Sequence, residues 1–301
     1  MKGFKEYLKV LLFILVCFVF QNISAQFSKT HYIPPIATTG SGPAAPQTQH
    51  LYISTPNEIP FNVTINPIGG TPITVQVSNA NPYEYYVGDG VDTNFIAQTN
   101  LSGQNLTDKG FIIEAEDLVY VSVRLFTSSQ LYQAGGVVSK GLAALGKEFR
   151  VGTFRNLGNL TGSQSQYLNF ISVLATQDNT TVNFSNFGNG VTIINDAETS
   201  NILLNTGESY VIAASPSSNP DNAEGFIGVL VESDKPIAVN SGSITGSNAN
   251  LDDGDYGQDV GIDQVAPVER IGSEYIFVRG VGPDEIERPL IVAHEDNTEV
   301  Y

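Results

Sequence analysis

The sequence predicts an all-β protein built from tandem β-sandwich-like repeats of about 118 residues. Three observations predict this class: short apolar segments with the periodicity of strands, turn residues between them, and almost no helical pattern. The composition agrees, because 41% of the 301 residues are apolar and only 15% are charged, which is typical of a folded chain. A β-propeller is the alternative, but the repeat exceeds a blade length of about 40–50 residues.

The N-terminus has the organisation of a secretory signal peptide. Lys2, Lys5 and Lys9 precede an apolar run over Val10–Phe20, and the small residue Ala25 follows. The run is shorter than the roughly 20 residues that span a bilayer, although an N-terminal membrane anchor is the alternative. We therefore expect cleavage after Ala25 and a protein that is secreted or displayed on the outer cell surface.

Cleavage would leave a strongly acidic chain without cysteine. The full chain has 14 Lys and Arg against 31 Asp and Glu, and removal of residues 1–25 changes the net charge from −17 to −19 and removes Cys17. An acidic surface argues against nucleic acid or an anionic membrane as partner. The lack of cysteine excludes disulfides and thiolate metal sites. No later apolar segment approaches membrane length, so we expect no transmembrane span after the signal peptide.

Several segments recur in the same order along the chain, which indicates an internal repeat. The Asp-Asn-Thr sequence at 178–180 recurs at 296–298, and the segment at Gly110 recurs at Gly228, each time 118 residues later. GKEFRVGTF at Gly146 also recurs as GSEYIFVRG at Gly272.

The recurrences divide the chain into units. We assign 1–25 to the signal peptide, 28–143 to the first and weaker unit, 144–269 to the second, and 270–301 to the start of a third. A larger offset beyond Gln133 places an insertion around 252–257 of the second unit. Because the third unit ends inside an expected strand, we expect the chain to be a fragment of a longer protein.

Strand patterns lie within each unit. Phe61–Ile65, Ile73–Val77 and Thr181–Phe184 alternate between apolar and polar residues, as half-buried strands do. Phe226–Val231 and Leu290–Ala293 are continuously apolar, which is typical of interior strands.

Turn residues separate these strands, and the one helical candidate, Ser139–Glu148, contains two glycines and predicts at most a short helical turn. The expected turns are Gly69-Gly70, Asp89-Gly90, Asn189-Gly190, Asn205-Thr206-Gly207 and Asp234-Lys235-Pro236.

An acidic, glycine-rich loop in the insertion predicts the place where calcium would bind, if the protein binds any ion. Calcium takes six to eight oxygen ligands, and closely spaced aspartates with flexible glycines supply them, although the spacing is not that of an EF-hand. The alternative is a solvated surface loop. The candidate ligands are Asp252, Asp253, Asp255, Asp259 and Asp263.

The tyrosine-rich segment NPYEYYVG predicts a sugar-binding platform at Tyr83 and Tyr85, which share one face of a strand, with Tyr86 on the other. The alternative is that these aromatic residues belong to the core. No other residue is assigned to ligand binding.

No catalytic or cofactor-binding residue is assigned. His31, His50 and His294 lack the spacing of metal ligands, and His294 is expected on the surface. No Gly-x-Ser-x-Gly motif is present. The repeated Asp178-Asn179 and Asp296-Asn297 pairs fit structural turns better than a site, because Asn tolerates left-handed backbone geometry.

The motifs GKEF, VLATQDNTTV, LNTGESYVI, VESDKPIAV, GQDVGIDQVAPVERIGSEYIFVRG and VAHEDNTEV resemble the IgGFc-binding protein N-terminal domain family, in its branch of exported Bacteroidetes proteins. The likeness covers about 110–301 well and 28–109 weakly. It implies a large surface or secreted protein, export by type IX secretion, and a gliding-motility-associated label. It implies no catalytic residue and does not license a claim of antibody binding.

We therefore expect a non-enzymatic, exported cell-surface protein that serves as an adhesion or binding scaffold, with an extracellular protein or glycan surface as partner. A tandem repeat supports this expectation because copies multiply weak contacts through avidity. The alternative is a secreted carbohydrate-binding module or glycoside hydrolase, since an acidic chain always offers carboxylate pairs. No cofactor is expected, calcium apart.

Overall fold

The computed structural model describes residues 26–40, 42, 45–127, 133–156, 167–246, 259–278, 280 and 289–301. Within these ranges the regular elements are β-strands and short 3-10 helices, so the all-β prediction is confirmed. The expected signal peptide and the centre of the acidic loop lie outside the described residues. No helix in the described ranges is both long and apolar enough to cross a bilayer.

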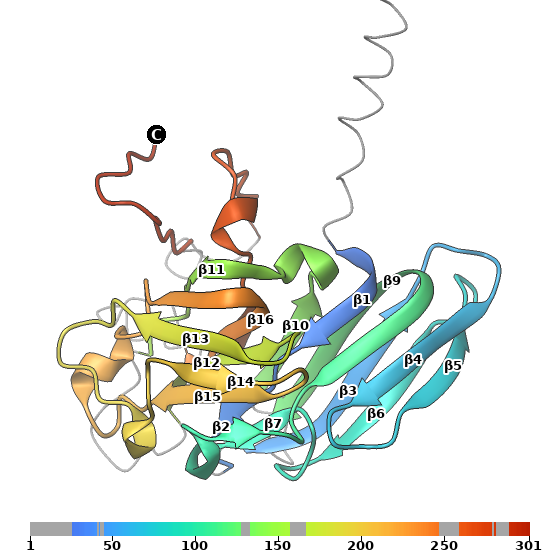
Figure 1. The fold of residues 1–301 in the computed structure, drawn as a ribbon, viewed down its shortest axis with the longest axis horizontal. Helices are drawn as coiled ribbons and strands as arrows, with labels where there is room; N and C mark the ends of the chain where they lie inside the picture. Colours follow the sequence, from blue (N-terminus) through green and yellow to red (C-terminus); the bar gives the residue numbers. More distant parts are fainter. Residues whose placement is uncertain are drawn as a thin grey trace, which may run out of the picture.

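Two large sheets lie side by side, with the first-sheet strands blue to green and the second-sheet strands mostly yellow to orange in Figure 1. The first has the order β5-β4-β9-β3-β6, with β1 and β10 also paired to β9. Its strands are β1 (Phe27–Ile33), β3 (Pro46–Ser54), β4 (Phe61–Pro67), β5 (Ile73–Val77), β6 (Tyr83–Asp89), β9 (Phe111–Thr127) and β10 (Gln133–Ser139).

The second sheet has the order β14-β13-β16-β12-β15-β8, with β11 and β17 also paired to β16. Its strands are β8 (Asn105–Leu106), β11 (Gly146–Arg150), β12 (Leu168–Ala175), β13 (Thr180–Ser185), β14 (Ile202–Leu204), β15 (Ser209–Ala214), β16 (Leu230–Gly246) and β17 (Asp259–Gln264).

Short elements complete the described fold. A small parallel sheet joins β2 (Ile36–Thr38) to β7 (Ile96–Gln98). The 3-10 helices are η2 (Thr99–Leu101), η3 (Gly141–Ala144), η4 (Ile194–Asp196), η5 (Pro220–Ala223) and η7 (Val268–Arg270). The short helical turn expected within Ser139–Glu148 is η3.

Each sheet is organised around one strand of 17 residues that changes partners along its length. The first half of β9 pairs with β1 and β4, and its second half pairs with β3 and β10. In the same way β16 pairs first with β11 and β13 and then with β12 and β17. A strand that exchanges partners in this way bends the sheet around a core instead of leaving it flat.

The two sheets have the same topology, strand for strand. When β1, β3, β4, β5, β6, β9 and β10 are matched in order to β11, β12, β13, β14, β15, β16 and β17, every pairing in the first sheet has its counterpart in the second. This correspondence supports the interpretation of an internal duplication. The boundaries 28–143, 144–269 and 270–301 stay predictions, and β8, from the first range, pairs with β15.

The sheets differ in how many of their faces are buried. Every residue of β12 and of β15 is buried, because one face packs into a core inside the second sheet and the other packs into the core shared with the first sheet. The sequence LNFISVLA of β12 is accordingly almost continuously apolar. By contrast, burial in β3 mostly alternates, so one face of the first sheet is left open to solvent.

Three of the five expected strands form where the alternation predicted them, as β4, β5 and β13. The interior strand expected at Phe226–Val231 is wrong in its first half, because Gly225 and Gly228 place that segment in a turn and β16 begins at Leu230. The turn expected at Asp234–Pro236 is also wrong, since these residues continue β16 near the point where it changes partners.

The strand expected at Leu290–Ala293 does not form, and most of this segment is exposed. The segment lies against Gly152 and the end of β11, where Arg150 donates a hydrogen bond to the His294 carbonyl oxygen at 3.2 Å. Among the described residues no neighbouring strand supplies the backbone pairing that an apolar segment needs in order to become part of a sheet.

The repeated Asp-Asn pairs occupy turns, as expected. Asn179 and Asn297 both have positive φ, at 55° and 59°. The Asp178 carboxylate accepts a hydrogen bond from the Thr206 amide at 3.0 Å, and this bond holds its pKa below the ordinary value. Asp178 therefore joins two neighbouring turns.

Candidate binding surface

Two of the five aspartates predicted as calcium ligands, Asp259 and Asp263, lie within the described residues. The Asp259 carboxylate accepts a hydrogen bond from the Ala134 amide at 2.7 Å, and Asp263 forms an ion pair with Lys140 at 2.7 Å. Both carboxylates thus connect β17 to residues at β10, and neither needs a metal for a partner. Asp252, Asp253 and Asp255 lie outside the described residues, and calcium binding there stays a prediction.

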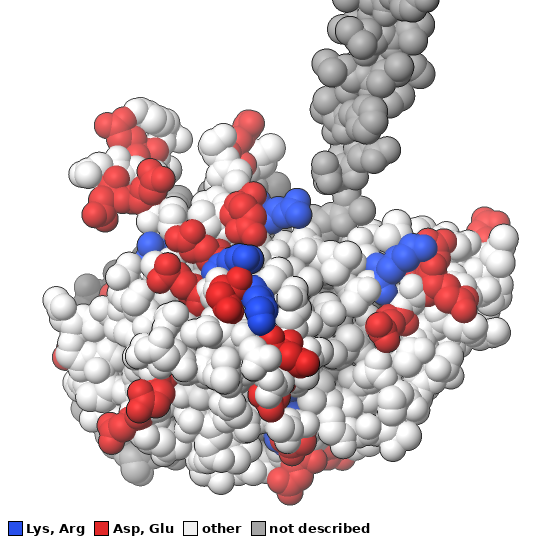
Figure 2. Space-filling view, in the orientation of Figure 1, with Lys and Arg blue, Asp and Glu red and all other residues white. Residues whose placement is uncertain are grey.

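No group of three metal-ligating side chains comes together within the ranges that the structure describes. Figure 2 shows acidic side chains in small groups across one face, several of them beside Lys or Arg. On this face the acidity is therefore spread over the surface.

The tyrosines of β6 are divided between its two faces. Tyr83 and Tyr85 are partly buried and pack against the core, and Tyr85 meets Phe111 edge-on with ring centroids 6.2 Å apart. A sugar site at these two residues stays untested, but they mainly complete the core. Tyr86 points to the opposite face and is 52% exposed.

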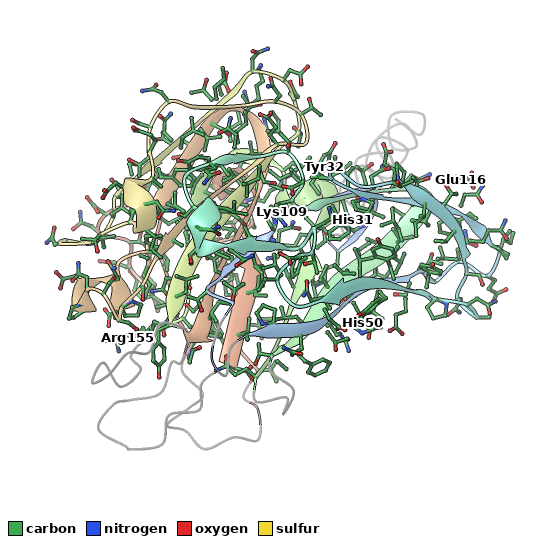
Figure 3. The ribbon with its side chains drawn as sticks, turned by 90° about the horizontal axis from the view of Figure 1, so that it is seen from below. His31, Tyr32, His50, Lys109, Glu116 and Arg155 are labelled. Atoms are coloured by element: carbon green, nitrogen blue, oxygen red, sulfur yellow. The ribbon has the colours of Figure 1, made fainter. Side chains whose placement is uncertain are left out.

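One exposed ring and two half-buried rings gather on the outer face of β6 and β3, beside β9. The His50 ring lies 5.4 Å from the Tyr86 ring and 6.0 Å from the Tyr52 ring, and the Arg124 guanidinium lies 5.2 Å from the centre of the Tyr52 ring. Figure 3 labels His50 at the periphery of the first sheet. We call this surface the ring platform; its residues are His50, Tyr52, Glu84, Tyr86 and Arg124.

Strand register explains why these side chains meet. His50 on β3 pairs directly with Tyr86 on β6 and with Arg124 on β9, so the three side chains form one row across the sheet. Tyr52 and Glu84 pair in the next row on the same face. Side chains directly opposite on neighbouring strands have Cβ atoms about 5 Å apart, which is the distance that allows rings to stack.

Polar contacts hold the platform in place. His50 Nδ1 lies 2.6 Å from Glu84 Oε1. A hydrogen bond to Asp89 raises the pKa of the Tyr86 hydroxyl. Arg124 stacks on Tyr52 and, among the described residues, pairs with no carboxylate. Its donors are therefore available to a ligand.

The corresponding row in the second sheet is buried and carries no large polar side chain. Phe170 on β12 pairs with Ala213 on β15 and with Gly242 on β16, in the places that correspond to His50, Tyr86 and Arg124. This side of the second sheet packs on the first half of the chain, where Asn240 donates a hydrogen bond to the Pro34 carbonyl oxygen at 2.8 Å. One face thus serves as an interface in the second sheet and remains open in the first.

Sequence reasoning had placed Tyr86 on this face of its strand but missed Tyr52, His50 and Arg124. A signal was present for the first two, because the polar and aromatic residues of QTQHLYIS alternate with buried Gln49, Leu51 and Ile53. Arg124 could not be found in this way, since it meets them only through pairing between strands about 70 residues apart in the sequence.

Apart from the ring platform, a depression of about 580 Å³ lies where β16 and β17 meet the segment after β11 and the C-terminal residues. Its lining includes Phe154, Gly242, Gly261 and Asp263. The Phe154 ring covers Gly261 so closely that a Cβ there would lie 2.0 Å from it. The depression combines apolar and charged groups without a cluster of catalytic type.

Comparison with known proteins identifies one family. The family model described as IgGFc binding protein matches residues 137–301, which is more than half of the chain. Searches of curated proteins and of solved structures found no significant match. The matched residues include the whole second sheet except β8, while all five residues of the ring platform lie before them.

Proposed function

This chain belongs to the IgGFc-binding protein family, and from that membership we propose that it is an exported, non-enzymatic binding protein that acts in adhesion at the cell surface. The family match is the observation that carries the proposal, because it indicates a role in binding. Export rests on the N-terminal sequence, in which three lysines precede a short apolar run and Ala25.

The architecture supports a binding role. The interior strands β12 and β15 of the second sheet pack on both faces, whereas the outer face of β3 in the first sheet is partly open to solvent and carries rings. Exposed aromatic groups beside an arginine are typical of residues that contribute most to binding. An extracellular protein or glycan surface is the partner class that we propose.

Cell fractionation tests the export part. We expect the protein outside the cytoplasmic membrane, accessible to added protease on intact cells, with an N-terminus at Gln26. Retention of a chain that starts at Met1 in the inner membrane would contradict export.

A binding assay tests the rest. Beads coated with the secreted protein should adhere to surfaces bearing extracellular protein or glycan, and beads coated with albumin should not. The same protein incubated with polysaccharides should release no reducing ends. Release of reducing ends would favour the glycoside hydrolase alternative, and failure to adhere to every surface would contradict a binding role.

A further inference from the structure

We propose that the ring platform is a binding site for a neutral glycan. This inference rests on the proposed binding function and names its site and ligand class. The argument has four steps: the platform is not required by the fold, its groups suit sugar rings, its area suits a small ligand, and its charge suits a neutral one.

The first step is the comparison between the two sheets. The corresponding row in the second sheet, Ala213–Phe170–Gly242, shows that this fold can be built with small or apolar side chains on that face. The first sheet carries Tyr86, His50 and Arg124 instead, and leaves Tyr86 52% exposed. A face that only had to be kept in water would carry charged and small polar residues rather than neighbouring aromatic rings.

The second step is chemical complementarity. A pyranose ring has an apolar C–H face, which stacks on aromatic rings, and a rim of hydroxyl groups, which need hydrogen-bond partners. The platform supplies both, because the His50 ring lies within about 6 Å of the Tyr86 ring and of the Tyr52 ring. The Arg124 guanidinium donates and the Glu84 carboxylate accepts, and both are planar groups suited to paired hydroxyls.

The third step is size. The platform spans β6, β3 and β9, which at about 4.8 Å between strands is about 10 Å across. Its residues occupy only two rows along the strands, so its area is on the order of 100 Å². A stable protein partner would cover about 800 Å² on each side. A few sugar residues match the platform without requiring further contacts.

The fourth step is charge. Arg124 and Glu84 balance each other on the platform, and Asp89, which is hydrogen-bonded to Tyr86, adds one negative charge beside it. The chain as a whole carries a net charge of −17, and its field repels polyanions. A neutral glycan is therefore favoured over an acidic one.

Affinity gel electrophoresis of the full secreted protein tests the proposal. The probes are the neutral polysaccharides laminarin, xylan, mannan and dextran, and the acidic polygalacturonate. We expect at least one neutral polysaccharide to retard the protein. Tyr86→Ala should weaken that retardation at least tenfold, and Arg124→Ala should also weaken it. Tyr86→Phe, which keeps the ring, should retain most of the binding.

The matched control is Tyr301→Ala, which removes an exposed tyrosine that belongs neither to the platform nor to the lining of the depression. It should bind as the unmodified protein does, and circular dichroism should show that every variant is folded. Retardation by polygalacturonate alone, by no polysaccharide, or equally for Tyr86→Ala and the unmodified protein would overturn the proposal. If the protein then still adheres to extracellular proteins, the glycan inference fails and the proposed binding function stands.

Discussion

At the scale of single residues, His31 is the clearest departure from what local sequence indicates. It is fully buried on β1, near the middle of the molecule in Figure 3. Nε2 faces the carbonyl oxygens of Val119 and Ser28 at 3.0 and 3.2 Å, so this nitrogen carries the proton, and Nδ1 lies 3.0 Å from the Ser139 hydroxyl oxygen. Val119 and Ser139 are 88 and 108 residues away, so no local pattern could predict this site.

Burial lowers the pKa of His31 to about 4, which makes the stability dependent on pH. The unfolded chain binds a proton at His31 near its ordinary pKa of 6.5, whereas the folded protein does not until about pH 4. Stability should therefore fall as the pH falls from about 6.5 to about 4, by about 3 kcal/mol from this residue.

Urea unfolding at pH 7, 5 and 4 measures this loss. In His31→Phe, which places on β1 the residue type that β11 carries at Phe149, the decrease in the free energy of unfolding should be smaller by a similar amount. Identical pH dependence in the two proteins would show that the pKa of His31 is the same in the folded protein as in the unfolded chain.

At the scale of elements, local periodicity predicted strands well and the ends of strands poorly. The alternation in FNVTI and ITVQV gave β4 and β5 because each strand has one face in the core. Asp234–Pro236 has the composition of a turn, yet it lies within β16, because the residues before it pair with β13 and those after it pair with β12. Pairing between distant segments decided the outcome there, and a single sequence does not show it.

The contact between β10 and β17 depends on a glycine. A Cβ on Gly135 would lie 2.6 Å from the Val260 carbonyl oxygen and 2.7 Å from the Val260 Cβ. Because both contacts are with backbone or branched atoms that cannot rotate away, we expect Gly135→Ala to reduce the free energy of unfolding by about 1–3 kcal/mol.

Gly272→Ala is the control, because the nearest atom to its added Cβ would be at 3.7 Å. Chemical denaturation of the two variants beside the unmodified protein is the measurement. Equal stability of all three would mean that the two strands are less tightly packed than the structure indicates.

At the scale of the whole molecule, the two sheets share a core. Leu168, Phe170 and Val211 from the second sheet belong to the same cluster as Leu51 and Val121 from the first. The repeat in the sequence predicted two similar units, and the matched topology supports it. The packing of one unit on the other was not predicted, although the almost continuously apolar sequence of β12 indicated that both of its faces are buried.

A shared core predicts cooperative unfolding of both sheets. Phe170→Ala should cost about 3–5 kcal/mol, and it should weaken the protection of β3 as well as of β12. Hydrogen exchange measured by mass spectrometry in increasing urea would follow peptides from both strands. Loss of protection in β12 while β3 stays protected would show two independent domains.

The unequal burial of the two sheets also bears on how this protein can evolve. Both faces of β12 are buried, so nearly any substitution in this strand lowers the free energy of unfolding. In β3 the outward positions, such as His50 and Tyr52, can change while Leu51 and Ile53 keep the core intact. Packing thus constrains the interior strands of the second sheet, whereas the outer face of the first sheet can change by surface mutation alone. Related chains should accordingly diverge first along the row from Tyr86 to Arg124, where side chains can change without rebuilding the fold.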